Sequence, residues 1–122
     1  MMGVTGMRIE NHRLVFETTT GDPAIFVWQD RSPAAAFKQL HIRIKTDSPR
    51  DEGLEFFWKT EAQPEYHQTR SAKTIITPSS EIAEYVLPLR EENGWKGRVT
   101  ELRLDPVMSS GVRVEIESIS LD

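Results

Sequence analysis

Hydrophobic and polar residues alternate in several segments of this sequence. Residues 40–46 read LHIRIKT, in which aliphatic residues alternate with polar or charged ones. Successive side chains of a β-strand point to opposite faces of a sheet, so this period of two predicts a strand with one buried face. The same alternation recurs in residues 101–105 and 112–116, as is typical of antiparallel sheets. The aliphatic positions then change from even to odd numbers, which predicts a β-bulge near Glu117 or Ser118.

Other short segments are rich in β-branched or aromatic residues, and this composition also predicts strands. Clusters of Gly, Pro, Asn and Asp separate them at regular intervals, as turns do. About eight strands with this punctuation predict an all-β fold, namely an antiparallel two-sheet β-sandwich of the jelly-roll type. The additional strands are predicted at residues 13–19, 24–29, 54–60, 73–77 and 84–89.

Outside the strands, two short helices are predicted. One covers residues 33–39, with Ser32 as its N-cap and a proline at its first position, and the other covers residues 79–83. Residues 1–6 begin with two methionines and contain two glycines, so we expect a flexible leader there. A chain of 122 residues then forms one domain of common size, over residues 7–122.

Charge and composition narrow the possible functions. The formal net charge is -4, and acidic and basic residues are spread along the chain, so no concentrated positive field is available to bind nucleic acid. The sequence has no cysteine, which excludes disulfides and thiolate metal sites. No apolar segment approaches the roughly 18–20 residues of a membrane-spanning helix, and the first residues lack the pattern of a signal peptide.

The remaining chemistry suits the recognition of sugars. Aromatic faces cover the apolar C–H side of a pyranose ring, while charged and amide groups hydrogen-bond its hydroxyls. The sequence supplies both kinds of side chain. The candidate ligand-binding residues are Trp28, Trp58, Tyr66 and Trp95, with Arg43, Arg70 and Arg103 as hydrogen-bond donors.

Each tryptophan also has a structural interpretation. Trp58 lies in an aromatic run, where it either packs into the core or contacts a ligand. Trp95 follows Asn-Gly at the end of a loop, a position that favours packing against the edge of the sandwich. Trp28 becomes exposed if Ile25 and Val27 are the buried residues of their strand, because neighbouring side chains alternate between faces.

Charged residues on two predicted strands offer a second kind of binding surface. If the strands share a sheet, His41, Arg43 and Lys45 on one strand and Arg103 on the other form a charged platform. Such a platform can bind acidic or hydroxyl-rich glycans. The alternative is that these residues belong to ordinary solvated strand faces, which carry most charges in any soluble domain.

Sequence signatures of catalysis are absent. No His-Glu-x-x-His, Gly-rich phosphate loop, Gly-x-Ser-x-Gly or cysteine nucleophile occurs. Glu55 and Glu101 are the best pair of carboxylates for glycoside cleavage, but two packed sheets leave little chain for a deep pocket. We therefore predict a domain without enzymatic activity. A structural or protein-interaction module with an apolar patch, and a small glycoside hydrolase, are the alternatives.

The C-terminal residues 95–122 contain an ordered set of motifs: Trp-x-Gly, then Leu-Arg-Leu-Asp-Pro, a glycine turn and a final strand ending in Ile-x-Leu. Upstream, TTGDPAIFV at 19–27, LHIRIKT at 40–46 and LEFFWKT at 54–60 follow one another. In this order they resemble the galactose-binding-like, carbohydrate-binding-module sandwiches that serve as accessory domains of bacterial polysaccharide-active proteins. The resemblance covers most of residues 14–122.

The resemblance implies a non-catalytic, secreted domain that tethers a larger protein to a polysaccharide, outside the cell or at its surface. The implied partners are a polysaccharide or oligosaccharide and the neighbouring domains of a longer chain. Ala24 replaces the aromatic residue that often follows Asp-Pro in such domains, which argues against ring stacking there. No cofactor is implied, but related sandwiches often hold a structural calcium ion near the chain ends, where Glu10 and Asp122 are the candidate ligands.

Overall fold

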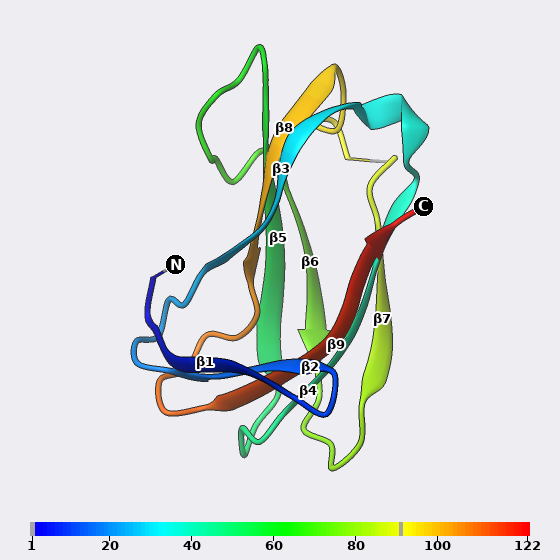
Figure 1. Ribbon diagram of the computed structural model, residues 1–122. Helices are drawn as coiled ribbons and strands as arrows, with labels where there is room; N and C mark the ends of the chain where they lie inside the picture. Colours follow the sequence, from blue (N-terminus) through cyan, green and yellow to red (C-terminus); the bar gives the residue numbers. More distant parts are fainter. Residues whose placement is uncertain (1, 91) are drawn as a thin grey trace.

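A computed structural model of the chain describes residues 2–90 and 92–122, except for the side chains of residues 28–30. The described residues form a β-sandwich of two antiparallel sheets (Figure 1), which confirms the predicted fold class. One sheet has the order β1-β2-β9-β4-β7 and the other β3-β8-β5-β6. The strands are β1 (Val4–Glu10), β2 (Arg13–Thr18), β3 (Ile25–Pro33), β4 (Gln39–Thr46), β5 (Glu52–Thr60), β6 (Ser71–Ile76), β7 (Ala83–Pro88), β8 (Arg98–Asp105) and β9 (Arg113–Leu121).

The core lies between the two sheets and follows the alternation in the sequence. Leu40, Ile42 and Ile44 of β4 are at most 1% exposed, while the polar residues between them are only partly buried. From the other sheet, Leu102 and Leu104 of β8 face the same interior. Each such side chain contributes about 1.5–3 kcal/mol when it leaves water, so the alternation fixes which face of each strand turns inward.

Two tryptophans close the core at one end of the sandwich. The rings of Trp58 and Trp95 meet edge to face, with their centroids 5.0 Å apart and an interplanar angle of 88°. The indole N–H of Trp58 donates to the carbonyl of Gly94 at 2.9 Å, and that of Trp95 donates to those of Ala34 and Phe37 at 2.9 and 3.1 Å. The pair therefore anchors two connecting segments to the core.

The predicted β-bulge is confirmed in β9. Along the pairing of β4 with β9, Arg43 is opposite Ser118, but the next residue, Ile44, is opposite Ile116. Glu117 is therefore the additional residue on β9. It shifts the inward-facing positions from even to odd numbers, which accounts for the change of register seen in the sequence.

The two predicted helices are wrong. Over residues 33–39 only Ala34–Ala36 form a short 3-10 helix, and the serine proposed as N-cap belongs to β3. The chain is extended again from Phe37, and the indole of Trp95 donates to the carbonyls of Ala34 and Phe37 on either side of this point. Residues 79–82 form a loop, and residue 83 is already the first residue of β7. No helix in the described part of the chain has the length and apolar character needed to cross a membrane.

The predicted leader over residues 1–6 is also wrong where the structure describes it. β1 begins at Val4, and Met2 pairs with Ala24 by two backbone hydrogen bonds. Gly6 has a φ of 65°, a left-handed conformation that glycine adopts without strain, and it lies where the pairing of β1 with β2 shifts register. The glycine at position 6 thus allows the local change of register in β1.

A buried carboxylate joins two turns at the opposite end of the sandwich. Glu52, at the start of β5, is 2% exposed and accepts hydrogen bonds from Ser48 Oγ at 2.6 Å, the backbone N–H of Met108 at 2.8 Å and Ser109 Oγ at 2.8 Å. Burial alone favours the neutral acid, but these hydrogen bonds to the charged form outweigh it and lower the pKa of Glu52. Its carboxylate therefore holds the 47–51 and 106–112 connections together.

Replacing Glu52 by Gln should lower the free energy of unfolding by about 1–3 kcal/mol at pH 7, because the amide cannot accept all three hydrogen bonds. Since the folded pKa is lowered, the stabilisation is present above the ordinary glutamate pKa and disappears as the pH falls through the folded value. Urea unfolding of the wild type and E52Q at pH 7 and pH 3 should show a smaller difference at pH 3. Exposed Glu81, as E81Q, is the control; equal effects of both variants would contradict the prediction.

Candidate functional site

The outward face of the four-stranded sheet carries a cluster of aromatic rings and charged side chains. On β5 and β8, residues that alternate with the core side chains point away from the other sheet. The strand register sets them in rows across the sheet. These rows are Phe26–Arg103–Phe57–Ser71, then Asp105–Glu55–Lys73 on one side of it and Glu101–Lys59 on the other.

Tyr66 folds back onto this face from the loop that joins β5 to β6. Its hydroxyl donates to Glu101 Oε1 at 2.6 Å. Its ring centroid lies 6.3 Å from that of Phe26 and 6.4 Å from that of Phe57, and Lys59 Nζ lies 4.5 Å from it. These contacts come from three neighbouring strands, so the loop places an aromatic ring over the middle of the sheet.

Arg103 is held between these rings. Its guanidinium carbon lies 4.6 Å from the centroid of Phe57 and 4.9 Å from that of Tyr66. Arg103 Nε and Nη2 donate to the two carboxylate oxygens of Asp105, both at 2.9 Å. Phe57 points outward and is nevertheless only 7% exposed, because the arginine and the tyrosine cover it. The face is thus fixed before any ligand arrives.

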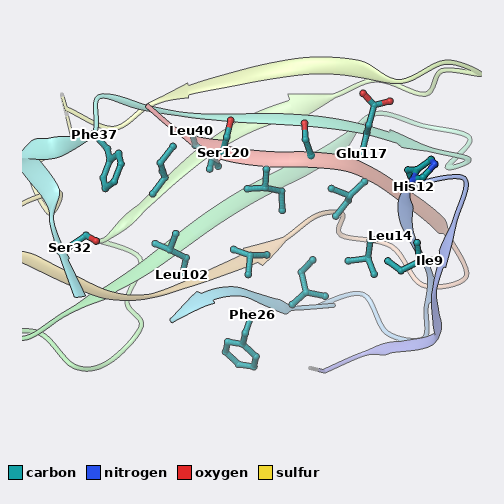
Figure 2. Close-up of a pocket in the computed structure, with 16 residues that line it drawn as sticks. Ile9, His12, Leu14, Phe26, Ser32, Phe37, Leu40, Leu102, Glu117 and Ser120 are labelled. Carbon is teal, nitrogen blue, oxygen red and sulfur yellow. The ribbon is translucent and has the colours of Figure 1, made fainter. Parts of the chain in front are cut away.

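Phe26 offers an open ring at the edge of the face. Figure 2 shows Phe26 on the opposite side of β3 from Leu102 and Leu40, which point into the space between the sheets. Phe26 is 43% exposed, in keeping with this outward direction. The cavity drawn in Figure 2, of about 610 Å³, lies between the sheets and is lined mainly by aliphatic side chains. Phe26 and Phe37 are among its lining residues, and His12 and Glu117 lie at its other end, so Phe26 borders both this cavity and the outer face.

Negative charge gathers at one end of the outer face. Burial raises the pKa of Asp105, and the neighbouring carboxylates Asp22 and Glu55 raise it further, while the hydrogen-bonded Arg103 acts in the opposite direction. A shallow cavity of about 410 Å³ opens there, within the size range of ligand pockets. This end therefore offers several carboxylate oxygens as hydrogen-bond acceptors.

The same cavity also has an apolar rim. Ile75 and Met108 are 60% and 69% exposed and line it beside the carboxylates. A Cβ on Gly53 would lie 2.8 Å from the sulfur of Met108, so glycine at this position lets the methionine lie against β5. Polar and apolar groups thus meet in one concave surface.

The structure brings two of the predicted ligand-binding residues together on this face, Tyr66 and Arg103. Trp58 and Trp95 are core residues, 0% and 7% exposed, which corrects their inclusion among the ligand contacts. Packing against the core and hydrogen bonding to loop carbonyls hold both indoles inside. The side chain of Trp28 lies outside the described part of the chain, so its predicted role stays a prediction.

The condition for the charged platform is not met, and the alternative of ordinary strand faces applies. β4 and β8 belong to different sheets, so His41, Arg43 and Lys45 lie on the other side of the sandwich from Arg103. Arg43 instead donates to Glu117 of β9 at 2.8 Å on the five-stranded sheet. Sequence alternation gave the correct outward residues of each strand, but it contains no information on which strands pair.

The candidate calcium ligands do not meet. Glu10 contacts Arg8 and Arg113, whereas Asp122 contacts His41. Within residues 2–90 and 92–122, no three His, Asp or Glu side chains come together in a way that could hold a metal ion. Each carboxylate is used in an ion pair with a basic side chain, so the structure does not support a calcium site at these residues.

Glu55 and Glu101 also fail to form a hydrolase pair. They lie in rows of the outer face that are separated by the row of Phe57 and Arg103. Four residues along β5 separate the rows, a distance of about 13 Å at roughly 3.3 Å per residue. Paired carboxylates of glycosidases lie about 5–9.5 Å apart, so this arrangement does not match the glycosidase alternative.

Sequence reasoning missed Phe26, Phe57 and Asp105 as members of the site. Their signal was present in the alternation, because Phe57 must face away from Phe56 and Trp58 on the same strand. The deciding fact is that Phe56 and Trp58, rather than Phe57, form the core, and no local pattern shows this. Arg70 lies apart from the outer face, in a loop-end cavity beyond Tyr66.

Comparisons with known proteins agree with this architecture. No protein-family model and no curated protein matches the chain. Among solved structures, a variant of a family 29 carbohydrate-binding module superposes with a TM-score of 0.64 and 14% identity, over 96% of this chain and 74% of that chain. For the CBM29_1 module of Piromyces equi, the values are 0.61 and 11%, over 99% and 80%.

A low-affinity xylan-binding module of family 86 from Roseburia intestinalis superposes with a TM-score of 0.58 and 6% identity, over 96% of this chain and 82% of that chain. The chain therefore has the fold of a carbohydrate-binding-module β-sandwich, which confirms the resemblance at the level of fold. Because identities are this low, the site must be judged from its own residues.

The hydroxyl of Tyr66 should ionise well above the ordinary tyrosine value. Burial is the main cause of its raised pKa, and the hydrogen bond to the Glu101 carboxylate adds to it. The difference in phenolate absorbance between the wild type and Y66F isolates this group during an alkaline titration. The variant E101Q should bring the pKa back toward the ordinary value, though not completely. Titration of Tyr66 like a free tyrosine would contradict the described contacts.

Proposed function

We propose that this chain is a non-catalytic carbohydrate-binding domain whose binding surface is the outer face of the β3-β8-β5-β6 sheet. One observation carries the proposal: Tyr66 and Phe26 lie beside the Arg103–Asp105 ion pair on a single face of a sandwich with the fold of carbohydrate-binding modules. A ring next to fixed polar groups is the arrangement that sugar binding needs.

The chemistry of the face fits a chain of hydroxyl-rich sugar rings. The partly exposed rings of Phe26 and Tyr66 can cover the C–H faces of pyranoses. Asp105 and Glu55 can accept hydrogen bonds from sugar hydroxyls. Lys73 and the guanidinium of Arg103 can donate hydrogen bonds to them. Because ion pairs and stacking hold these groups in place, little conformational entropy is lost on binding.

The names of the structural neighbours support a sugar-binding role. Variants of the family 29 module are described in complexes with mannohexaose and cellulohexaose, in studies of ligand recognition. The residues replaced in those studies include an arginine and an aspartate that are two positions apart in that chain. Arg103 and Asp105 have the same spacing on β8 and form the central ion pair of the outer face.

We further propose that the domain tethers a larger protein to a polysaccharide outside the cell or at its surface, as a secreted accessory domain. A binding face spread over an open sheet suits an extended polymer, since several sugar units can contact adjacent rows at once. The strands nearest the two ends of the chain, β1 and β9, belong to the other sheet.

The variant R103A should weaken binding of cellohexaose or mannohexaose at least tenfold, equivalent to about 1.4 kcal/mol, because it removes the donor that orders both Tyr66 and Asp105. The matched control is R43A, which removes an arginine with a similar carboxylate bond from the opposite sheet. Isothermal titration calorimetry of both variants against both hexasaccharides makes the comparison.

A second pair of variants tests the aromatic contribution. Phe26 and Val86 are exposed to nearly the same extent, 43% and 44%, but lie on different sheets. F26A should weaken binding, whereas V86A should not. If R103A and F26A bind as the wild type does, or if neither hexasaccharide nor xylohexaose binds the wild type, the outer face is not a sugar-binding surface.

A further inference from the structure

Another cavity opens at one end of the sandwich, beyond the loop that carries Tyr66. It has a volume of about 740 Å³ and lies between residues 60–63 and 69–70 of the β5–β6 connection and residues 93–98 before and at the start of β8. Figure 1 shows both connections at the same end of the molecule. The loop 61–70 therefore borders this cavity and also supplies a ring to the outer face.

Basic side chains dominate this cavity, although the protein as a whole has a net charge of -4. Arg70, Lys96 and Arg98 line it, with Glu61 as the single carboxylate among the described lining residues. Glu61 pairs with Arg98, at 3.9 Å between two largely exposed side chains. Within the described residues, no carboxylate lies within ion-pair distance of Arg70 or Lys96, so the cavity has an excess of positive charge.

The cations of the outer face differ in this respect. Lys59, Lys73 and Arg103 each have a carboxylate partner at 3.8, 3.7 and 2.9 Å. The positive charges of the outer face are therefore balanced by neighbouring carboxylates, and this face suits uncharged sugars. The loop-end cavity has cations whose charge is available to a ligand.

Arg70 carries a second sign of an unfilled site. Its Nε is shielded from solvent and has no hydrogen-bond partner among the described residues. Its Nη2 is held by the backbone carbonyl of Glu65. Buried donors are paired in most proteins because an unpaired one is costly. A small shift of the Arg70 side chain toward an oxygen acceptor in the cavity would give this donor the partner that it lacks.

The walls of the cavity are held by the core. The indole of Trp58 donates to the carbonyl of Gly94, and the backbone N–H of Glu61 donates to the carbonyl of Arg98 at 3.0 Å. A Cβ on Gly94 would lie 2.8 Å from Arg70 Cγ, so only glycine lets the two connections approach so closely. The basic groups are thus attached to a preformed scaffold.

We propose, on the basis of the carbohydrate-binding function, that this cavity is a second subsite, which binds the carboxylate or sulfate group of an acidic saccharide. Arg70 and Lys96 supply the charge, and the guanidinium of Arg70 has the geometry to pair with two oxygens of either anion. A glycan on the outer face that passes Tyr66 reaches the cavity across a single loop. The domain would therefore prefer an acidic polysaccharide to a neutral one.

The test compares cellohexaose with hexagalacturonate and with a sulfated carrageenan hexasaccharide, by calorimetry and by ¹H–¹⁵N NMR. The indole N–H of Trp58 reports on the cavity, because its acceptor is Gly94, and the Nε–H of Arg103 reports on the outer face. At low salt, we expect at least one acidic probe to bind at least tenfold more tightly than cellohexaose and to shift the Trp58 signal. High salt should reduce this advantage.

The variant R70Q/K96Q should lose the advantage of the acidic probe and keep the affinity for cellohexaose. The control K38Q/R50Q removes the same number of charges at exposed positions outside the cavity and should keep both. K96Q alone should lose part of the advantage of the acidic probe. Because it alters an exposed side chain, it can be measured even if the double variant does not fold.

Equal binding of neutral and acidic hexasaccharides, or an acidic advantage that persists in R70Q/K96Q, would overturn the subsite. The two proposals fail separately. If cellohexaose and mannohexaose leave the Arg103 signal unchanged while an acidic probe shifts that of Trp58, the outer face is refuted and the cavity stands. If the neutral sugars shift only Arg103 and no acidic probe shifts Trp58, the outer face stands and the cavity is refuted.

Discussion

The whole arrangement depends on the burial of one face of β5 and β8. Once Phe56 and Trp58 turn into the core with Leu102 and Leu104, the pleat forces the residues between them outward. Those residues include Phe57, the arginine that packs against the rings of Phe57 and Tyr66, and most of the charges of the candidate site. A register slip of one residue would exchange the inward-facing and outward-facing residues. The hydrophobic effect that buries one set therefore also determines which side chains lie on the outer surface.

Trp58 connects this core to the end of the molecule. Its ring packs against Trp95, its indole N–H holds Gly94, and its backbone N–H donates to the carbonyl of Arg70 at 3.3 Å. Both connections around the loop-end cavity are therefore attached to one buried residue. The loop with Tyr66 lies between that cavity and the outer face, so one short segment borders both surfaces.

Similarity to carbohydrate-binding modules extends over nearly the whole chain at only 6–14% identity. Such similarity reflects the shared geometry of two packed sheets, because many sequences satisfy the same alternation. The Arg103–Asp105 pair with its covering rings is a property of this chain's own side chains. It depends on a register between β5 and β8 in which Phe57 lies opposite the arginine.

From the sequence alone, the period of two determined most of the strands, a bulge near Glu117 or Ser118 and the membership of Arg103 in an outward-facing set. Only the tertiary structure decided that β4 and β8 lie in different sheets, that the indoles of Trp58 and Trp95 are buried, and that Tyr66 folds onto the sheet. The physical reason is that alternation is a local property of one strand. Strand pairing and loop packing depend on contacts between residues far apart in the chain.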